Sequence, residues 1–350
     1  MRYWNSRLQK MSAYIPGEQP DKINEYIKLN TNENPFSPSE VVLNAIKSAC
    51  NEQLRLYPNV TSQSLRESFA KLNNIEVDNI FVGNGSDEIF TLIFRGFIDP
   101  DGSAAFPYPS YSLYYTMAEA NGIKYDRINL TDEMDVDFTR FLEKQYNLVI
   151  VGNPNNPTGK GCDEDEIRIF LDQFNGLLVV DEAYVDFYGE TVIELVEDYD
   201  NLIVTRSFSK SYSLAGLRIG LAVANRDIIK GLFKLKDSYN VDRLAEVGAR
   251  AALLDIKGFE YNIRLVLDNK EYLEENLEEL GFDIIPSKAN FLFVKHPEMP
   301  SKDIFELLKE KKILVRYFDG SIQSDYIRIT VGTMLELKAL IKELTSILEA

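Results

Sequence analysis

The order of the apolar segments restricts the possible folds of this chain more than any other feature of its sequence. From about residue 36 to residue 240, short apolar runs such as 147–151, 202–204 and 219–224 alternate with stretches of helical periodicity. Short apolar runs between helices are typical of buried strands, and this alternation predicts a mostly parallel sheet that helices cover on both faces. We therefore expect an α/β fold.

The organisation changes after residue 240. Two long helical patterns come first, and strands then mix with further helices, which predicts a smaller α+β domain. We expect its helices at 247–254, 261–280, 302–310 and 335–348, and its strands at 282–285, 290–294, 313–316 and 326–330. A chain of 350 residues is long enough for two domains. The predicted parts are an N-terminal arm (1–35) that joins the small domain, a large domain (36–240) and the small domain (241–350).

The charge balance argues against several classes of partner. With 38 basic and 55 acidic residues the net charge is −17, which disfavours nucleic acid and anionic membranes. No apolar run approaches the roughly 20 residues of a membrane span, and residues 1–17 lack the apolar core of a signal peptide. Two cysteines, Cys50 and Cys162, suit a reduced, cytoplasmic protein, and the single histidine, His296, argues against a metal site built on a histidine cluster.

A loop of small and hydroxyl residues (207–220) carries a lysine, Lys210, and an arginine, Arg218, after an apolar run. Open α/β sheets bind their ligands at this carboxyl edge of the strands. A buried lysine can lose its proton and attack a carbonyl, whereas arginine stays charged and binds phosphate as a fork. The pair fits pyridoxal 5′-phosphate, which carries an aldehyde and a phosphate arm on neighbouring ring carbons. The simpler alternative is a solvated basic loop.

Two other strand ends carry side chains that suit the same cofactor. The run 176–184 delivers Asp181 and Tyr184, and the run 147–151 leads into a Pro/Gly-rich loop that presents Asn156. A carboxylate against the ring nitrogen keeps the ring protonated, so that it accepts electrons. The tyrosine hydroxyl and the asparagine amide can hydrogen-bond the phenolic oxygen beside the aldehyde. The alternative for the second loop is an ordinary turn.

A third segment offers a phosphate site. The run 79–82 is followed by a glycine turn at 83–88 and a helical pattern that reaches about residue 97. Free backbone N–H groups at a helix N-terminus bind phosphate, although Ser and Asp are also favoured there as ordinary caps. The predicted phosphate-binding residues are Gly85, Ser86, Asp87, Ser207, Ser209 and Arg218.

Together these segments resemble the fold-type I pyridoxal-phosphate aminotransferases, and among them most closely the histidinol-phosphate aminotransferase family. The resemblance extends over essentially the whole chain. Besides the loops above, it includes residues 29–35, 56–58, 109–114, 239–241, 287–293, 315–317 and 327–333. The sequence departs from the family pattern at Asn59, where Asp is frequent, and at Ser238, where Pro is frequent.

The resemblance implies a role for each matched residue. It implies that Lys210 is the Schiff-base lysine and moves the proton, while Asp181, Asn156 and Tyr184 contact the ring. It further implies that Tyr111 stacks on the ring and that Tyr57 reaches the phosphate from the neighbouring subunit. Arg328 and Arg316 are implied to bind the substrate anion. Tyr14 is implied to close over substrate, and Asn156 also belongs to the implied substrate site.

The function implied by the resemblance is a homodimeric transaminase with shared active sites. It would convert L-histidinol phosphate and 2-oxoglutarate into imidazole-acetol phosphate and L-glutamate, a step of histidine biosynthesis. An aromatic amino acid aminotransferase shares nearly every motif, and a threonine-phosphate decarboxylase has the same fold, so the sequence leaves these alternatives open. A metabolite-sensing domain behind a DNA-binding module is a further class, for which we expect the segment before Leu29 to be too short.

Overall fold

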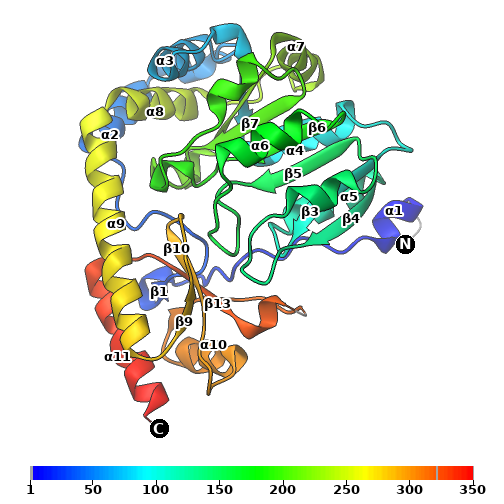
Figure 1. Cartoon of the computed structure of the whole chain (residues 1–350). Coiled ribbons are helices and arrows are strands. Elements are labelled where there is room, and N and C mark those ends of the chain that lie inside the picture. The colour runs from blue at the N-terminus through cyan, green and yellow to red at the C-terminus, as the bar shows by residue number, and fades with distance from the viewer. Residues whose placement is uncertain (1–2, 321, 350) are drawn as a thin grey trace.

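The structure is a computed structural model that describes residues 3–320 and 322–349 (Figure 1). Residues 1 and 2 of the predicted arm and residues 321 and 350 of the predicted small domain therefore lie outside the described residues. The larger part of the molecule is built on a seven-stranded sheet of order β2-β8-β7-β6-β5-β3-β4. Its strands are β2 (Ile80–Asn84), β3 (Ser103–Tyr108), β4 (Lys124–Asn129), β5 (Leu148–Gly152), β6 (Leu177–Asp181), β7 (Leu202–Ser207) and β8 (Ile219–Ala224).

One strand of this sheet runs against the others. Strand β8 pairs antiparallel with both β2 and β7, whereas β3 with β4, β3 with β5, β5 with β6 and β6 with β7 are parallel pairs. Strands β5 and β7 are buried along their whole length, as expected for strands covered on both faces. The predicted α/β fold with a mostly parallel sheet is confirmed.

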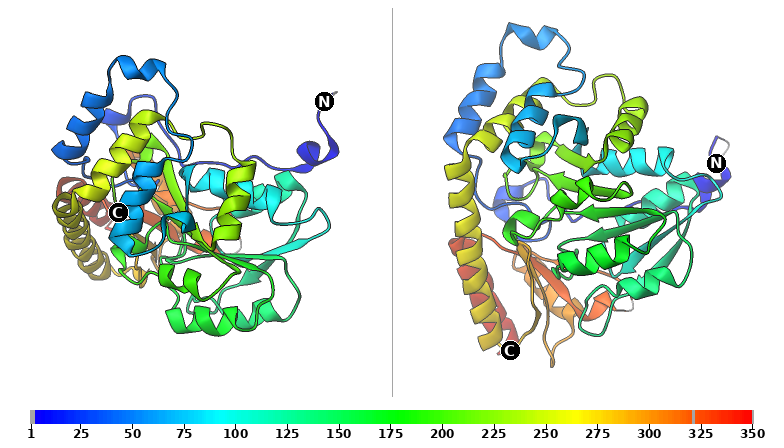
Figure 2. Two further views of the ribbon diagram at one scale, coloured as in Figure 1. Left: turned by 90° about the horizontal axis from the view of Figure 1, so that it is seen from above. Right: turned by 45° about the horizontal axis from the view of Figure 1, so that its top comes forward.

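Helices cover both faces of the large sheet and form two hydrophobic cores with alternate residues of the strands. One face packs on α4 (Gly85–Gly96), α5 (Leu113–Asn121) and α7 (Arg226–Leu235). The other packs on α2 (Glu40–Ala49), α3 (Gln63–Asn73), α6 (Glu164–Leu171) and α8 (Arg243–Leu254). Figure 2 shows these layers from two further directions.

The smaller part contains an antiparallel sheet of order β12-β13-β10-β9 and three helices. Its elements are α9 (Ile256–Glu279), β9 (Asp283–Ile285), β10 (Phe291–Lys295), α10 (Ser301–Glu310), β12 (Arg316–Tyr317), β13 (Ile327–Thr330) and α11 (Met334–Leu348). Helices α9 and α11 lie along one side of this sheet, and α9 extends upward to the large part (Figure 1). None of the helices that the structure describes is long and apolar enough to cross a membrane.

The arm begins with the short helix α1 (Ser6–Lys10), which lies against α5, and then crosses to the small part. There β1 (Ile27–Lys28) pairs in parallel with β11 (Ile313–Leu314). Short 3-10 turns lie at Ile23–Glu25, Glu52–Arg55, Val77–Asn79, Phe138–Leu142, Val185–Phe187, Ile193–Glu197, Ala215–Leu217 and Gln323–Asp325.

Three sequence-based expectations were wrong. The helix predicted at 247–254 in the small domain begins earlier, at Arg243, and packs against the core of the large sheet. The single strand predicted at 313–316 is divided into β11 and β12, because its first half pairs with β1 and its second half with β13. The helix predicted at 261–280 begins earlier, at Ile256, where the Asp255 side chain accepts a hydrogen bond from the Gly258 amide. The division of the chain into domains at residues 35 and 240 stays a prediction.

The contact between β8 and the start of α4 generates a stability prediction. A methyl group at Gly220 would lie 2.5 Å from the Ser86 amide nitrogen and 2.6 Å from the Gly85 carbonyl carbon. Because these are backbone atoms, Gly220→Ala should lower the free energy of unfolding by about 1–3 kcal/mol, the range typical of overpacking. Urea denaturation followed by circular dichroism measures the change.

Gly216→Ala is the matched control, since a methyl group there meets nothing within 4 Å. Equal urea midpoints for Gly220→Ala and the unmodified protein would contradict the predicted clash.

Candidate active site

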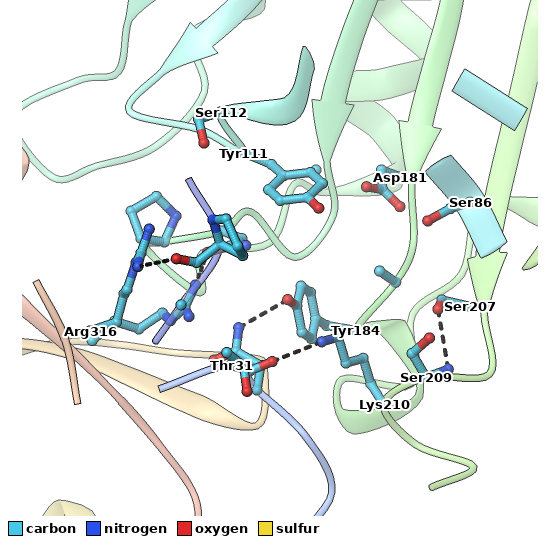
Figure 3. A pocket seen from close by; sticks show the side chains of 18 of the residues that line it. Thr31, Ser86, Tyr111, Ser112, Asp181, Tyr184, Ser207, Ser209, Lys210 and Arg316 are labelled. Carbon is cyan, nitrogen blue, oxygen red and sulfur yellow. Dashed lines mark hydrogen bonds between the residues drawn. The ribbon is translucent and has the colours of Figure 1, made fainter. Parts of the chain in front are cut away.

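A cavity of about 420 Å³ opens at the carboxyl ends of β5, β6 and β7 (Figure 3). Its walls come from the arm, the large part and the small part of the chain. The predicted site residues that line it are Tyr14, Ser86, Asp87, Tyr111, Asn156, Asp181, Tyr184, Ser207, Ser209, Lys210, Arg218, Arg316 and Arg328. Segments more than 300 residues apart in the sequence therefore meet at one place.

Lys210 lies just beyond the end of β7 and points its amine into the cavity (Figure 3). The Nζ atom donates a hydrogen bond of 3.1 Å to the backbone carbonyl of Thr31. Desolvation in the cavity, with a further contribution from the positive charge of Arg328, lowers the pKa of Lys210 to about 8. A sizeable share of the amine is therefore neutral near physiological pH, which a nucleophile or general base requires.

Asp181 is the last residue of β6 and is buried. Its two carboxylate oxygens accept hydrogen bonds from the Tyr114 hydroxyl (2.6 Å) and the Thr205 hydroxyl (3.0 Å). Burial nevertheless raises the pKa of Asp181, because a charged carboxylate lacks a cationic partner there. The protonated nitrogen of a pyridine ring is a partner of this kind. Tyr114 and Thr205 were not predicted from the sequence.

Tyr184 and Asn156 are each oriented by a neighbour from another part of the chain. Asn32 Nδ2 donates to the Tyr184 hydroxyl oxygen (2.9 Å), and Arg328 Nη1 donates to Asn156 Oδ1 (2.6 Å). These contacts leave the Tyr184 O–H and the Asn156 NH₂ as donors. Burial raises the pKa of Tyr184 to about 12, so its hydroxyl keeps its proton at neutral pH. Asn32 was also missed, although it lies in the matched segment 29–35.

The predicted phosphate-binding residues converge at the N-terminus of α4. Arg218 Nη2 lies 3.0 Å from Asp87 Oδ2, and its Nη1 lies 3.4 Å from Ser209 Oγ. The Ser209 amide donates to Ser207 Oγ (3.2 Å). Gly85 does not line the cavity itself, but it has a φ of +75° and a methyl group there would lie 2.6 Å from Arg218 Nη2. Helix N-terminus, hydroxyls and guanidinium together suit a phosphate group.

A second group of cations lies on the small sheet. Arg316 on β12 and Arg328 on β13 are directly opposite each other in the antiparallel register. Burial is the main cause that lowers the pKa of Arg328 to about 10. The charge of Tyr184 raises this pKa, and the charge of Arg316 lowers it. The Arg328 Nη2 atom donates to the backbone carbonyl of Asn30 (2.8 Å).

Arg316 is held by the arm. Its Nη2 and Nη1 atoms donate to the carbonyl oxygens of Ile15 (2.9 Å) and Pro16 (3.1 Å). Among the described residues these two carbonyls are its hydrogen-bond partners. The neighbouring Tyr14 ring meets the Tyr111 ring edge to face, with centroids 5.9 Å apart, so the arm forms one wall of the cavity.

Tyr57 is a second predicted site residue, besides Gly85, that does not line this cavity. Its side chain is 75% exposed and stacks on Tyr239, with ring centroids 4.2 Å apart. The structure therefore gives Tyr57 no role in the cavity of its own chain, and its predicted role in a neighbouring subunit stays a prediction. Within the described residues, no group of three or more His, Cys, Asp or Glu side chains is placed to hold a metal ion.

The fold and the site together define an aminotransferase of the α/β type, and comparisons with known proteins agree. Residues 24–344 match the family model of class I and II aminotransferases. The chain is 40% identical to a histidinol-phosphate aminotransferase of Clostridium beijerinckii, over 99% of this chain and 98% of that protein. It is 42% identical to histidinol-phosphate aminotransferase 1 of Bordetella parapertussis, over 99% of both chains. The chain belongs to the class I and II aminotransferases and, within them, to the histidinol-phosphate aminotransferases.

A solved structure supports the fold. The histidinol-phosphate aminotransferase of Sinorhizobium meliloti in complex with pyridoxal-5′-phosphate superimposes with a TM-score of 0.92. The match covers 100% of this chain and 98% of that one at 22% sequence identity. The family resemblance and the fold class predicted from the sequence are thus confirmed.

Proposed function

We propose that this protein is a pyridoxal-phosphate-dependent transaminase that converts L-histidinol phosphate and 2-oxoglutarate into imidazole-acetol phosphate and L-glutamate. The observation that carries the proposal is the cavity amine of Lys210, with its pKa near 8, placed between two separate groups of anion-binding side chains. The names of relatives at about 40% identity support the choice of substrate.

The residues of the cavity fit pyridoxal phosphate. Arg218, Ser207 and Ser209 would hold its phosphate at the start of α4, and the unpaired charge of buried Asp181 would face its ring nitrogen. The free donors of Tyr184 and Asn156 would face its phenolic oxygen. When bound, the cofactor supplies an aldehyde for amines and a protonated ring that accepts electrons.

The remaining steps belong to side chains of this chain. Lys210 Nζ would take the proton from the substrate α-carbon, since its neutral amine is accessible near neutral pH. Tyr114 and Thr205 would keep the Asp181 carboxylate in place, while the Tyr14 and Tyr111 rings would exclude water from one side of the cavity.

The two arginines of the small sheet favour a phosphorylated substrate. Arg316 and Arg328 are adjacent in register, and two guanidinium groups suit a dianion better than a single carboxylate. Arginine forks also match the carboxylates of 2-oxoglutarate, so one site can serve both half-reactions. An aromatic amino acid as donor would need only one of the two arginines, and this is the second candidate.

We also propose that the enzyme is a homodimer in which Tyr57 completes the partner's site. Leu54, Leu56, Tyr57 and Val60 expose between 49% and 75% of their surface on one loop, beside a hollow that Arg243 and Leu244 also line. A cluster of exposed apolar side chains is typical of a protein interface. We propose in addition that the protein is cytoplasmic and that its domain boundaries lie at residues 35 and 240.

The identity of the reactive lysine is directly testable. We expect borohydride to fix the cofactor on Lys210, because reduction converts a carbon–nitrogen double bond into a stable link and Lys210 Nζ is the lysine amine that enters the cavity. Peptide mapping by mass spectrometry locates the link, with Lys210→Ala as the control that should remain unlabelled. A pyridoxyl group on a different lysine would refute the proposed chemistry.

The substrate is tested by Arg316→Ala. Loss of one charge-assisted contact to phosphate should cost on the order of 2–4 kcal/mol in kcat/KM for histidinol phosphate. The same variant loses the contacts to Ile15 and Pro16, but that loss affects every donor equally, so phenylalanine serves as the internal reference. Equal losses for the two donors, or a preference of the unmodified protein for phenylalanine, would favour the aromatic aminotransferase.

The role of Tyr57 across the interface is tested by mixing two defective chains, Lys210→Ala and Tyr57→Ala. If Tyr57 acts in the partner's site, random exchange of subunits leaves about a quarter of the sites intact and restores activity. The exposed position of Tyr57 makes the substitution compatible with folding. Mixed dimers, shown by native mass spectrometry, that recover no activity would exclude this role.

A further inference from the structure

Three residues of the arm form a polar cluster next to the amine of Lys210. The Lys28 amine donates to Thr31 Oγ1 and to the Glu33 carboxylate, and Thr31 Oγ1 donates to Glu33 Oε2 over 2.9 Å. The backbone carbonyl of the same Thr31 accepts the hydrogen bond from Lys210 Nζ. The cluster is fixed at one end, because Lys28 belongs to β1 and pairs with β11. The position of the Lys210 amine thus depends on this loop.

Charged groups from the arm cluster and from three further places surround Lys210. Arg328 on β13 and Arg218 after β7 disfavour the ammonium form of Lys210. Glu33 of the arm and Asp87 on α4 favour it. The Glu33 effect is the larger of the two favourable ones. The Tyr184 ring also faces the amine, with its centroid 5.7 Å from Nζ.

Lys28 controls how much of the Glu33 charge is available to Lys210. The Lys28 side chain is only 14% exposed, and its contact keeps the pKa of the Glu33 carboxyl below the ordinary value against the opposing effect of burial. Glu33 is thus a carboxylate that is paired with Lys28. Lys28 contacts Glu33, and Glu33 in turn favours the ammonium form of Lys210.

We infer that Lys28 and Glu33 are positioning residues for Lys210: through Thr31 they hold its amine in the cavity, and their opposed charges set the share of the amine that is neutral. The inference rests on the proposed role of Lys210. It predicts effects of opposite sign for the two residues, since removal of Glu33 removes an anion while removal of Lys28 exposes that anion.

The experiment measures how fast acetic anhydride labels Lys210 in the full-length, cofactor-free protein as a function of pH, with mass spectrometry as the readout. Glu33→Gln should speed labelling at pH 7 roughly two- to threefold, as a fall of about half a pKa unit would. Lys28→Met should slow it by a similar factor. Lys28→Arg, which keeps the charge, and the double variant Lys28→Met/Glu33→Gln should both remain near the unmodified protein.

Glu25→Gln is the matched control, because Glu25 is an arm carboxylate that pairs with Lys312 and does not line the cavity. If the cluster only supported the loop, both single variants would loosen it and speed labelling together. That result, or unchanged labelling in both, would overturn the inference. Since labelling needs no cofactor, its outcome is separate from the borohydride result that tests the proposed function.

Discussion

The concentration of positive charge in one cavity is the constraint on which the rest of the site depends. Lys210, Arg218, Arg316 and Arg328 all line it. Desolvation is the main cause that lowers the pKa values of Lys210 and Arg328, and repulsion from neighbouring cations lowers them further. The chain offsets this desolvation mainly with neutral acceptors, because backbone carbonyls receive the hydrogen bonds of Lys210, Arg316 and one Arg328 nitrogen. Such a cavity retains a field that attracts anions, although the whole protein carries a net charge of −17.

A buried charged network behind the cavity keeps the strand ends in register. Along β7, Thr205 and Ser207 contribute to the cavity side, while Arg206 between them turns to the opposite side and contacts Glu182 and Asp186. Asp186 also accepts a hydrogen bond from Ser211, the residue after Lys210. Burial raises the pKa of Glu182 to about 7, despite Arg206 and the donors of Thr191 and Val192.

This network therefore connects the neighbours of the two central side chains. Glu182 follows Asp181 and Ser211 follows Lys210, so Arg206 and Asp186 link the end of β6 to the end of β7. A partner removed from such a network leaves an unpaired buried charge, which is strongly destabilising. Rigid strand ends are what allow side chains from two strands to meet one ligand with fixed geometry.

The sequence predicted the parts of the site that belong to single segments. Buried strands lead into the loops of Asp181 and Lys210 as expected, although β7 continues to Ser207, beyond the predicted run 202–204. What it missed depends on contacts between distant segments: Tyr114 reaches Asp181 over 67 positions and Asn32 reaches Tyr184 over 152. The break between β11 and β12 has the same origin, since pairing partners and not local propensity divide that run.

The hydrogen bonds from Arg316 to the arm are compatible with a role for the same side chain in substrate binding. A guanidinium carries five N–H donors, and the two carbonyls of Ile15 and Pro16 occupy one donor on each terminal nitrogen. Donors remain for a phosphate, which forms stronger, charge-assisted hydrogen bonds than a neutral carbonyl does. A bound dianion would also relieve the repulsion between Arg316 and Arg328 that lowers the pKa of the latter. The hydrogen bonds to the arm therefore leave Arg316 with donors that face no competition from the two carbonyls.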